Sequence, residues 1–269
     1  MHQKTKLFLK SWLPPEIFRI VKGLSRIAWS GDYNSWAEAK KMSVGYDNEE
    51  ILKRVKDSLL KVKNGEAIYE RDSILFDKIQ YSWPLLAALM WITTQSKGVL
   101  NVIDFGGSLG STYFQNKKFF SSLPAGVHWN IVEQKHFVDT GKKYFEDDEL
   151  KFYYTIEDCM TDSSPNTILL SSVIQYLENP SNILEKVKSL GFEFILFDRV
   201  SFSPLGKKDR LTVQTIHLDK HTISYPCWFF DKNSFFAFFE DKYCTIIEFI
   251  SSDEANIRST FEGRLLRKK

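Results

Sequence analysis

Short apolar runs rich in β-branched residues alternate with amphipathic stretches from about residue 99 to residue 198. The apolar runs, which predict strands, cover residues 99–105, 128–134, 150–156, 166–173 and 192–198. The stretches with apolar residues at helical spacing cover 111–123, 136–145 and 179–191. Strands without a polar face that alternate with helices indicate a parallel sheet covered by helices on both faces. The pattern therefore predicts an α/β domain.

Residues 1–70 follow a different pattern, which predicts helices and loops. Residues 48–65 carry apolar residues at helical spacing and end at a glycine. Residues 73–95 are predicted to be helical around Pro84, either as two helices or as one kinked helix. We therefore divide the chain into a helical N-terminal extension, residues 1–70, and an α/β domain, residues 71–269.

The alternation of strands and helices stops after residue 198. Residues 209–218 alternate apolar and polar positions like a strand, and residues 224–230 predict another strand. Residues 231–243 predict a helix with Asp231 as its N-cap and phenylalanines on a buried face. The last two predicted strands, which we expect to form an antiparallel pair, cover 245–251 and 261–268.

Composition and charge narrow the functional classes only slightly. A net charge of +2 on 269 residues gives no basis for predicting a nucleic-acid surface. The three cysteines lie far apart without a CxxC pair. They therefore predict neither a zinc site nor a disulfide framework, and they fit a reducing cytoplasm. The longest uncharged apolar stretch, near residues 82–92, is too short to span a bilayer.

Residues 1–30 are basic and apolar, with six Lys or Arg and a single acid, Glu16. Lys10 and a pair of prolines interrupt the apolar region, so the segment does not have the pattern of a signal peptide. Two interpretations remain. The segment could pack as a helix on its own domain or on a partner, or it could contact an anionic membrane surface.

The stretch "NVIDFGGSLGSTYF", residues 101–114, places a glycine-rich turn between the first predicted strand and a helix. Glycines allow a tight turn and let a ligand approach the backbone, and the following helix offers its N-terminal amides. The spacing fits neither the dinucleotide fingerprint nor a P-loop. It fits Asp-x-Gly-x-x-x-Gly, formed by Asp104, Gly106 and Gly110. This turn resembles motif I of class I S-adenosylmethionine (SAM) methyltransferases, with Ser108 where their commonest form has a glycine.

Glu133 ends the second predicted strand. A carboxylate at the tip of this strand can accept hydrogen bonds from both ribose hydroxyls of a nucleoside, because it has paired acceptor oxygens. The alternative is a solvated glutamate at a strand end. Together with the glycine turn and the order of strands and helices, Glu133 favours a SAM-binding fold.

A closer resemblance rests on longer stretches spread over most of residues 29–250. They are "WSGDYNSWAEA" (29–39), "GYD" (45–47), "GEAIYERDSILF" (65–76), "DFGGSLGSTYFQN" (104–116), "VEQKHFVDTGKKYF" (132–145), "SSVIQYLENP" (171–180), "DRVSF" (198–202) and "SYPCWFF" (224–230). In these stretches the chain resembles a group of bacterial SAM-dependent methyltransferases that are encoded in surface-polysaccharide gene clusters.

The resemblance implies a Rossmann-like class I methyltransferase fold with a mostly parallel seven-stranded sheet and helices on both faces. It implies SAM as the cofactor and S-adenosylhomocysteine as its product. The glycine turn would border the methionine moiety, Glu133 the ribose, and the acids after the third strand the adenine, with a solvated loop as the alternative for these acids. The segment that contains Arg71 would either cap the next helix or close over the cofactor. The expected cofactor-binding residues are Asp104, Gly106, Gly107, Ser108, Gly110, Glu133, Glu157, Asp158, Ser171 and Arg71.

An insertion at about residues 199–230 is expected to build the acceptor site, as it does in such enzymes. The expected substrate-binding residues are Gln175, Tyr176, Arg199 and Trp228, and core packing is the alternative for the aromatic ones. A hydroxyl acceptor also needs a base to remove its proton. The candidate bases are His217, His221, Asp198 and Glu178, and a structural ion pair with Arg199 is the alternative for Asp198. The two histidines lack a clear third ligand, so no metal is expected.

We therefore expect a cytoplasmic SAM-dependent methyltransferase that transfers a methyl group to oxygen of a sugar or sugar-linked group. The acceptor would be a small molecule or a glycan, and contact with the inner membrane is the second interpretation of the basic N-terminus. Three alternatives stay open. The first is transfer to another small polar acceptor, the second a non-catalytic subunit with a SAM fold, and the third a protein that binds nucleotide sugars.

Overall fold

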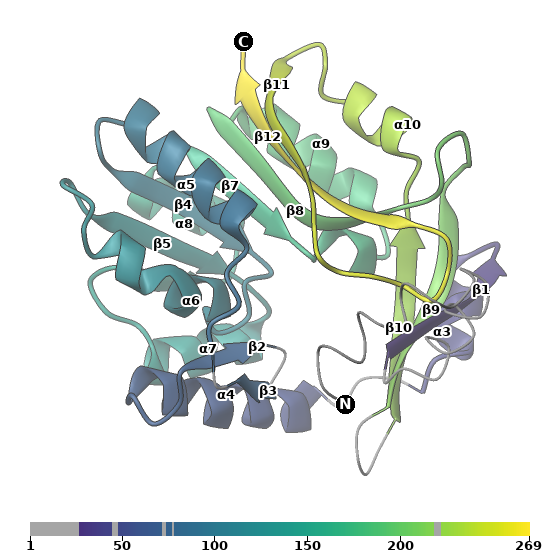
Figure 1. Cartoon of the computed structure of the whole chain (residues 1–269), viewed down its shortest axis with the longest axis horizontal. Coiled ribbons are helices and arrows are strands. Elements are labelled where there is room, and N and C mark those ends of the chain that lie inside the picture. Colours follow the sequence, from purple (N-terminus) through teal and green to yellow (C-terminus); the bar gives the residue numbers. More distant parts are fainter. Residues whose placement is uncertain (1–26, 45–47, 72–73, 77, 218–221) are drawn as a thin grey trace, which may run out of the picture.

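The computed structural model describes residues 27–44, 48–71, 74–76, 78–217 and 222–269. Its centre is a seven-stranded sheet with the order β11-β12-β8-β7-β4-β5-β6 (Figure 1). Neighbouring strands from β6 to β8 pair in parallel, whereas β12 is antiparallel to both β8 and β11. The strands are β4 (Leu100–Phe105), β5 (Val127–Val132), β6 (Leu150–Tyr153), β7 (Thr167–Ser171), β8 (Phe194–Phe202), β11 (Tyr243–Ile250) and β12 (Thr260–Lys268). This confirms the predicted mostly parallel sheet and its terminal antiparallel pair.

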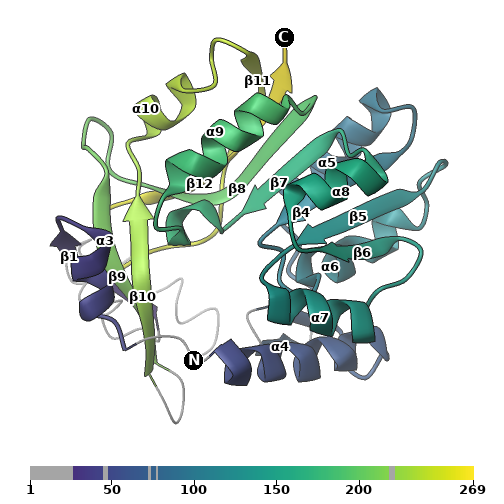
Figure 2. The same ribbon diagram turned by 180° about the vertical axis from the view of Figure 1, so that it is seen from behind.

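Helices cover both faces of this sheet, because successive strand residues point to opposite sides and both sides are apolar. Val102, Leu169 and Leu196 pack under one group of helices. This group consists of α4 (Asn48–Lys63), α5 (Trp83–Gln95), α6 (Ser111–Phe120) and α7 (Lys135–Tyr144). Their chain neighbours Ile103 and Ile195 pack under the other group, seen from behind in Figure 2. That group consists of α8 (Ile156–Ser163), α9 (Pro180–Leu190) and α10 (Lys232–Ala237).

A second, three-stranded antiparallel sheet stands beside the first and has the order β1-β9-β10. It is formed by β1 (Ile27–Tyr33), β9 (Arg210–His217) and β10 (Thr222–Phe229), and α3 (Trp36–Lys41) packs on it. The two strands predicted at 209–218 and 224–230 are therefore confirmed as a hairpin.

The predicted helical extension at residues 1–70 is corrected by this sheet. Helices α3 and α4 agree with the prediction, but residues 27–33 form the strand β1. The segment pairs with β9, which lies far later in the chain, and a local pattern cannot reveal such a partner. Residues 1–26, and with them most of the basic segment, lie outside the described residues.

Two further local predictions are corrected. Residues 73–95 are not helical throughout, because β2 (Tyr69–Arg71) and β3 (Ile74–Phe76) form a hairpin. Helix α5 follows with Pro84 in its first turn. Backbone N–H groups in the first turn have no partner within the helix, so the missing N–H of proline costs no hydrogen bond there, and Pro84 starts the helix instead of kinking it. The acids after β6, expected in a loop, belong to α8. Among the described residues, no helix is long and apolar enough to span a membrane.

Candidate functional site

The carboxyl ends of β4, β5, β7 and β8 meet at one edge of the main sheet, because these strands are parallel. The glycine turn follows β4, Glu133 follows β5, and Ser171 ends β7. Strand β8 continues past its predicted end at Asp198 to Phe202. The edge therefore gathers most of the predicted site residues, as ligand sites in open α/β sheets do.

Backbone geometry explains the glycines of the turn. Gly106 has φ +72°, and a Cβ there would collide with the side chain of Val173. A Cβ on Gly107 would lie 2.5 Å from Cγ of Asp104. Ser108 also adopts a left-handed conformation, with φ +56°, and Gly110 is the N-cap of α6. The turn therefore packs directly on its neighbours and offers its half-exposed backbone to the edge.

Asp104 lies beneath this turn and is only 2% exposed. Its Oδ2 accepts a hydrogen bond of 3.1 Å from the indole Nε1 of Trp129 on β5. Burial raises the pKa of this carboxyl to about 7, and the Trp129 hydrogen bond and the charge of Arg199 oppose the rise. Asp104 thus supports the turn from below, so a ligand above the turn would meet the backbone and not this carboxyl.

Glu133 connects the end of β5 to the glycine turn. Its carboxylate accepts a hydrogen bond of 2.5 Å from the backbone N–H of Gln134. Burial raises the pKa of Glu133, and the backbone N–H groups of Gln134 and of Ser108 in the turn counteract the rise. The carboxylate is therefore held at the point where the turn and β5 meet.

Glu70, on the other side of the turn, is 1% exposed. Its Oε2 accepts a hydrogen bond of 2.6 Å from Oγ of Ser111, the first residue of α6. A carboxylate there is favourable because the N-terminus of a helix carries partial positive charge. Arg71 ends β2, one residue later. The hairpin β2–β3 therefore flanks the glycine turn, and the carboxylate of Glu70 contacts the first residue of α6.

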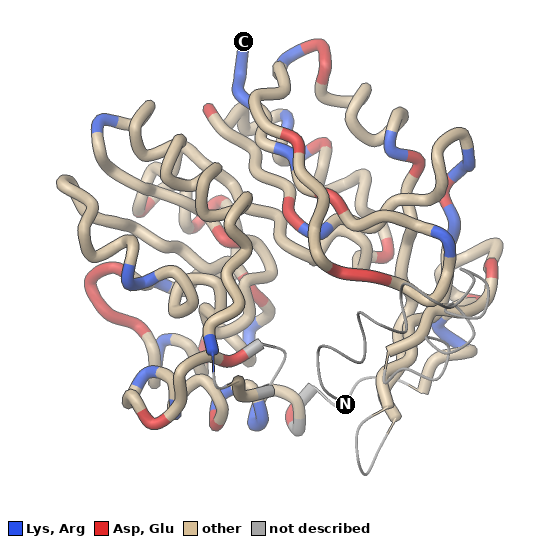
Figure 3. The backbone as a smooth tube through the Cα atoms, viewed as in Figure 1, with Lys and Arg blue, Asp and Glu red and all other residues tan. Residues whose placement is uncertain are grey.

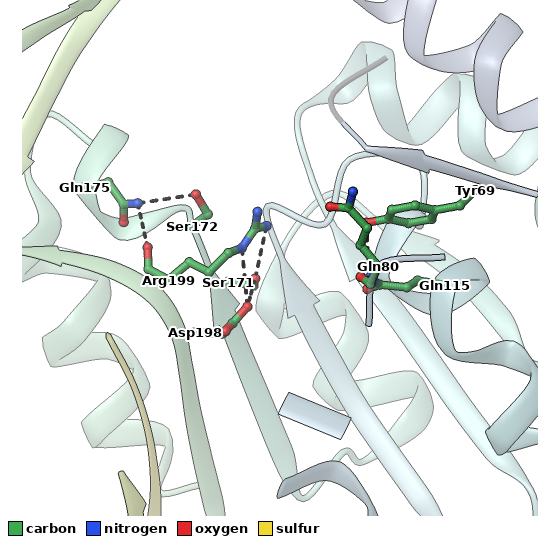
Figure 4. A network of polar contacts seen from close by, with 8 residues as sticks. All are labelled: Tyr69, Gln80, Gln115, Ser171, Ser172, Gln175, Asp198 and Arg199. Atoms are coloured by element: carbon green, nitrogen blue, oxygen red, sulfur yellow. Dashed lines mark hydrogen bonds and ion pairs between the residues drawn. The ribbon is translucent and has the colours of Figure 1, made fainter. Parts of the chain in front are cut away.

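A polar network joins the ends of β7 and β8 (Figure 4). Ser171 donates to Oδ2 of Asp198 at 2.7 Å, and Nε of Arg199 lies 3.4 Å from the same oxygen. Gln175 donates to the carbonyl oxygen of Arg199 at 3.0 Å and to Oγ of Ser172 at 3.4 Å. Asp198 is 1% exposed, and burial raises its pKa while Arg199 opposes the rise. The ion pair considered for Asp198 is thus present.

Residues after β7 also connect this edge to the second sheet. The short helix η1 (Ile174–Tyr176) ends at Tyr176, whose hydroxyl donates to Oε1 of Gln214 on β9 at 2.8 Å. The indole of Trp228 on β10 donates to the carbonyl oxygen of Leu177 at 3.2 Å. Trp228 also stacks on Trp36, with ring centroids 6.4 Å apart. These contacts fix the hairpin β9–β10 beside the edge of the main sheet.

Several predicted residues lie in other surroundings. Glu157 forms an ion pair of 2.7 Å with Lys186 of α9, and Asp158 lies in the first turn of α8. His217 ends β9 as an exposed residue, and its Nδ1 lies 3.1 Å from Oγ1 of Thr222 on β10. His221 lies outside the described residues. None of these placements joins them to the network of the β7 and β8 ends.

Two features of the edge were not predicted. The register of β4 and β5, with Val102 opposite Trp129, brings the indole diagonally to Asp104, and aligning the two predicted strands could have found this contact. The loop between β11 and β12 lies beside the edge as well, with its acidic residues in red in Figure 3. Asp253 of this loop raises the pKa of Asp198. No sequence signal connects residues so far apart in the chain.

A cavity of about 300 Å³ lies at the opposite edge of the sheet, where the strands begin. Gln95, Asn101, Asn166 and Glu193 are among the residues that line it. Ligands of open α/β folds bind at the carboxyl ends of the strands, so this cavity is separate from the candidate site.

No protein-family model matches the sequence, and a comparison with curated protein sequences found no match. Solved structures with a similar fold include a Burkholderia thailandensis 1,6-didemethyltoxoflavin-N1-methyltransferase with S-adenosylhomocysteine bound, at 11% identity and a TM-score of 0.43 over 84% of this chain and 92% of that one. The N-terminal domain of EvdMO1, in the presence of S-adenosylhomocysteine and D-fucose, is 15% identical with a TM-score of 0.45 over 83% and 98%.

A magnesium protoporphyrin IX methyltransferase from Synechocystis PCC 6803, with S-adenosylhomocysteine bound, is 11% identical with a TM-score of 0.44 over 69% of this chain and 81% of that one. At these identities and scores, the assignment of the fold depends on the strand order of the chain itself. That order, with the reversed strand β12 between β8 and β11, is that of a Rossmann-like fold with a mostly parallel seven-stranded sheet.

Proposed function

We propose that the protein is a SAM-dependent methyltransferase. The observation that carries the proposal is the position of the Glu133 carboxylate beside the backbone N–H of Ser108 in the glycine turn, at the carboxyl end of the second parallel strand. A nucleoside can place its ribose hydroxyls on such a carboxylate while the rest of the molecule lies along the turn and the N-terminus of α6.

The charge of this edge favours SAM over a nucleotide sugar. The carboxyl groups of Glu133 and Asp253 lie on or beside it, the carboxyls of Asp104 and Asp198 lie buried beneath it, and Arg199 is a cation that acts on the two buried ones. The diphosphate of a nucleotide sugar would add negative charge to these acids, whereas the sulfonium of SAM adds a positive one. This comparison makes a nucleotide-sugar binding protein the weaker alternative.

We further propose that the two sheets have different roles in binding. The seven-stranded sheet would bind the cofactor, and the unit of β1, α3, β9 and β10 would bind the acceptor. This replaces the boundary at residue 70, because β1 is part of the unit. Tyr176 and Trp228 lie where the two parts meet, so they are the residues that we expect to contact the acceptor, whereas the buried Gln175 holds the backbone of Arg199.

The acceptor that we propose is a hydroxyl of a sugar or sugar-linked group, used in the cytoplasm during assembly of a bacterial surface polysaccharide. The support for it is the resemblance to methyltransferases of surface-polysaccharide gene clusters. SAM is already an activated electrophile. The protein must therefore align the acceptor oxygen with the methyl–sulfur bond, exclude water and accept the hydroxyl proton. His217 and His221 remain our candidates for the base, because the buried Asp198 is already engaged by Ser171 and Arg199.

Isothermal titration with S-adenosylhomocysteine tests the proposal. We expect micromolar binding to the wild type and its loss in Glu133→Ala. Glu185→Ala, which removes an exposed acid from α9, is the matched control and should bind like the wild type. UDP-sugars should not compete. A folded wild-type protein that binds no S-adenosylhomocysteine would overturn the proposal, and competition by a UDP-sugar would favour the alternative.

A further inference from the structure

Arg199 has an unusual backbone conformation at the candidate site. It adopts φ +53° within β8, in the left-handed region that L-residues other than glycine rarely occupy. Gln175 fixes this conformation, because its side chain donates a hydrogen bond of 3.0 Å to the carbonyl oxygen of Arg199. Strained residues that are held in this way cluster at ligand-binding sites. The conformation coincides with a shift in the register of β8 and β12 between Glu262 and Arg264, a β-bulge of the kind that re-aims a side chain beside a binding site.

The side chain of Arg199 is fixed as well. Its Nε lies 3.4 Å from Oδ2 of Asp198, and its Nη2 lies 3.4 Å from Oγ of Ser171. Figure 4 shows the guanidinium reaching from β8 over Ser171 at the end of β7. The side chain is 24% exposed, in contrast to the buried carboxyl of Asp198. The guanidinium is therefore held at the surface of the edge.

Strand register puts this guanidinium at the height of the glycine turn. Strand β7 lies between β8 and β4, with Leu169 opposite Asp104 and Ser171 opposite Asp198. Ser171 is thus two residues nearer to the carboxyl edge than the level of Asp104. The positive charge of Arg199 also lowers the pKa of Asp104, so it acts across β7 on the base of the turn. A ligand on the turn would meet the guanidinium from the β8 side.

We propose that Arg199 binds the carboxylate of the methionine moiety of SAM. This inference rests on the proposed function. The carboxylate is the one anionic group of SAM, and the glycine turn would lie along the same part of the cofactor. An arginine already oriented by Asp198 and Ser171 can form a charge-assisted hydrogen bond with a carboxylate at little further cost in conformational entropy. Asp198 is then a positioning residue that acts through Arg199.

A matched pair of ligands tests this inference by isothermal titration. S-adenosylhomocysteine carries the carboxylate, whereas decarboxylated S-adenosylhomocysteine keeps the adenosine, the sulfur and the amino group. The wild type should prefer the first by about tenfold or more, the size expected for one hydrogen bond to a charged group. Arg199→Gly should bind the two ligands equally, with the affinity for the decarboxylated ligand unchanged. Glycine is chosen because it relieves the left-handed conformation.

Two further variants separate binding from folding. Arg199→Lys keeps the charge without the planar fork and should retain part of the preference for the carboxylate. Arg267→Ala removes an arginine near the start of β8, where it lies 3.9 Å from Glu193, and should keep the full preference. Circular dichroism of each variant establishes that it is folded.

The possible outcomes are distinct. If the wild type prefers S-adenosylhomocysteine and Arg199→Gly keeps that preference, the inference is wrong while the proposed function stands. If Arg199→Gly weakens both ligands equally, the arginine only supports the fold of the edge, and the inference is also wrong. If it changes neither affinity, Arg199 does not contribute to binding of the cofactor, and the inference is wrong. If the folded wild type binds neither ligand, the proposed function fails and the inference fails with it.

Discussion

The indole of Trp129 and the carboxyl of Asp104 are joined by a buried hydrogen bond of 3.1 Å that connects the neighbouring strands β5 and β4 of the main sheet. The bond stabilises the ionised form of Asp104, because an N–H donor favours a carboxylate over a carboxylic acid. A residue of the sheet core, Trp129, therefore influences the charge of the carboxyl on which the glycine turn packs.

Replacing Trp129 by Phe tests this link. We expect the pKa of Asp104 to rise further above about 7, because the donor that lowers it is lost. We also expect the free energy of unfolding to fall by about 2 kcal/mol, from the lost hydrogen bond and the smaller ring. Urea unfolding measures the stability, and NMR titration of the carboxyl measures the pKa. An unchanged pKa would show that the bond does not act on the charge.

Asp104 should make stability depend on pH. Its pKa is raised from 3.8 to about 7 in the folded protein, so between these values the folded state holds a proton that the unfolded state has released. The contribution of Asp104 to the free energy of unfolding is therefore largest below pH 3.8, falls as the pH rises toward about 7, and stays low above that pH. Asp104→Asn should remove this dependence and gain stability over the wild type at about pH 8. Thermal unfolding of both proteins across this pH range is the measurement.

Gly106→Ala should destabilise the protein more than Gly65→Ala. Both glycines have similar left-handed φ angles, +72° and +76°. An added Cβ would collide with Val173 at Gly106, whereas nothing lies within 4 Å at Gly65. Each variant should lose about 1 kcal/mol from backbone strain, and Gly106→Ala about 1–3 kcal/mol more from overpacking.

Binding of S-adenosylhomocysteine should be lost only in Gly106→Ala. A second replacement, Val173→Ala, opens space beside the added methyl group and should restore part of the lost stability. Equal destabilisation in the two single variants would mean that the turn tolerates a side chain at Gly106.

Replacing His217 and His221 together by Ala should abolish methyl transfer but leave the binding of S-adenosylhomocysteine intact, because neither residue is expected to contact the cofactor. Radiolabelled methyl transfer to the acceptor and isothermal titration check the two halves of this prediction. Turnover that survives the double replacement would show that the base is another residue.

The parallel sheet was predictable because each of its strands is buried on both faces. Val102 and Ile103 enter opposite cores, so the apolar run is continuous and stands out from its surroundings. Helix α8 was missed, although Thr155 and Asp158 have the spacing of a capping box and the Thr155 side chain does accept a hydrogen bond from the Asp158 backbone. The same signal predicts that Glu157 lies on a helix, as it does.

Strand β1 could not be found from local pattern in the same way. Its seven residues are mostly exposed, and the hydrogen bonds that define it come from β9. At the candidate site, motif and spacing predicted the turn and Glu133 because these residues follow their strands directly. The contacts of Glu70 with Ser111 and of Tyr176 with Gln214 join distant segments, and only the folded chain shows them.

The pairing of β1 with β9 also constrains how the protein is made. A ribosome releases the chain from its N-terminus, so β1 emerges long before β9 exists. The contact between Arg210 and Gly31, for example, spans 179 residues. Asn256, later still, holds Trp29 of β1 through both backbone groups. The second sheet is therefore expected to close after β4, β5, β6 and β7 have begun to pair. Under the proposed function, a nascent chain would form the glycine turn and the site of Glu133 before the hairpin β9–β10 that we propose for the acceptor.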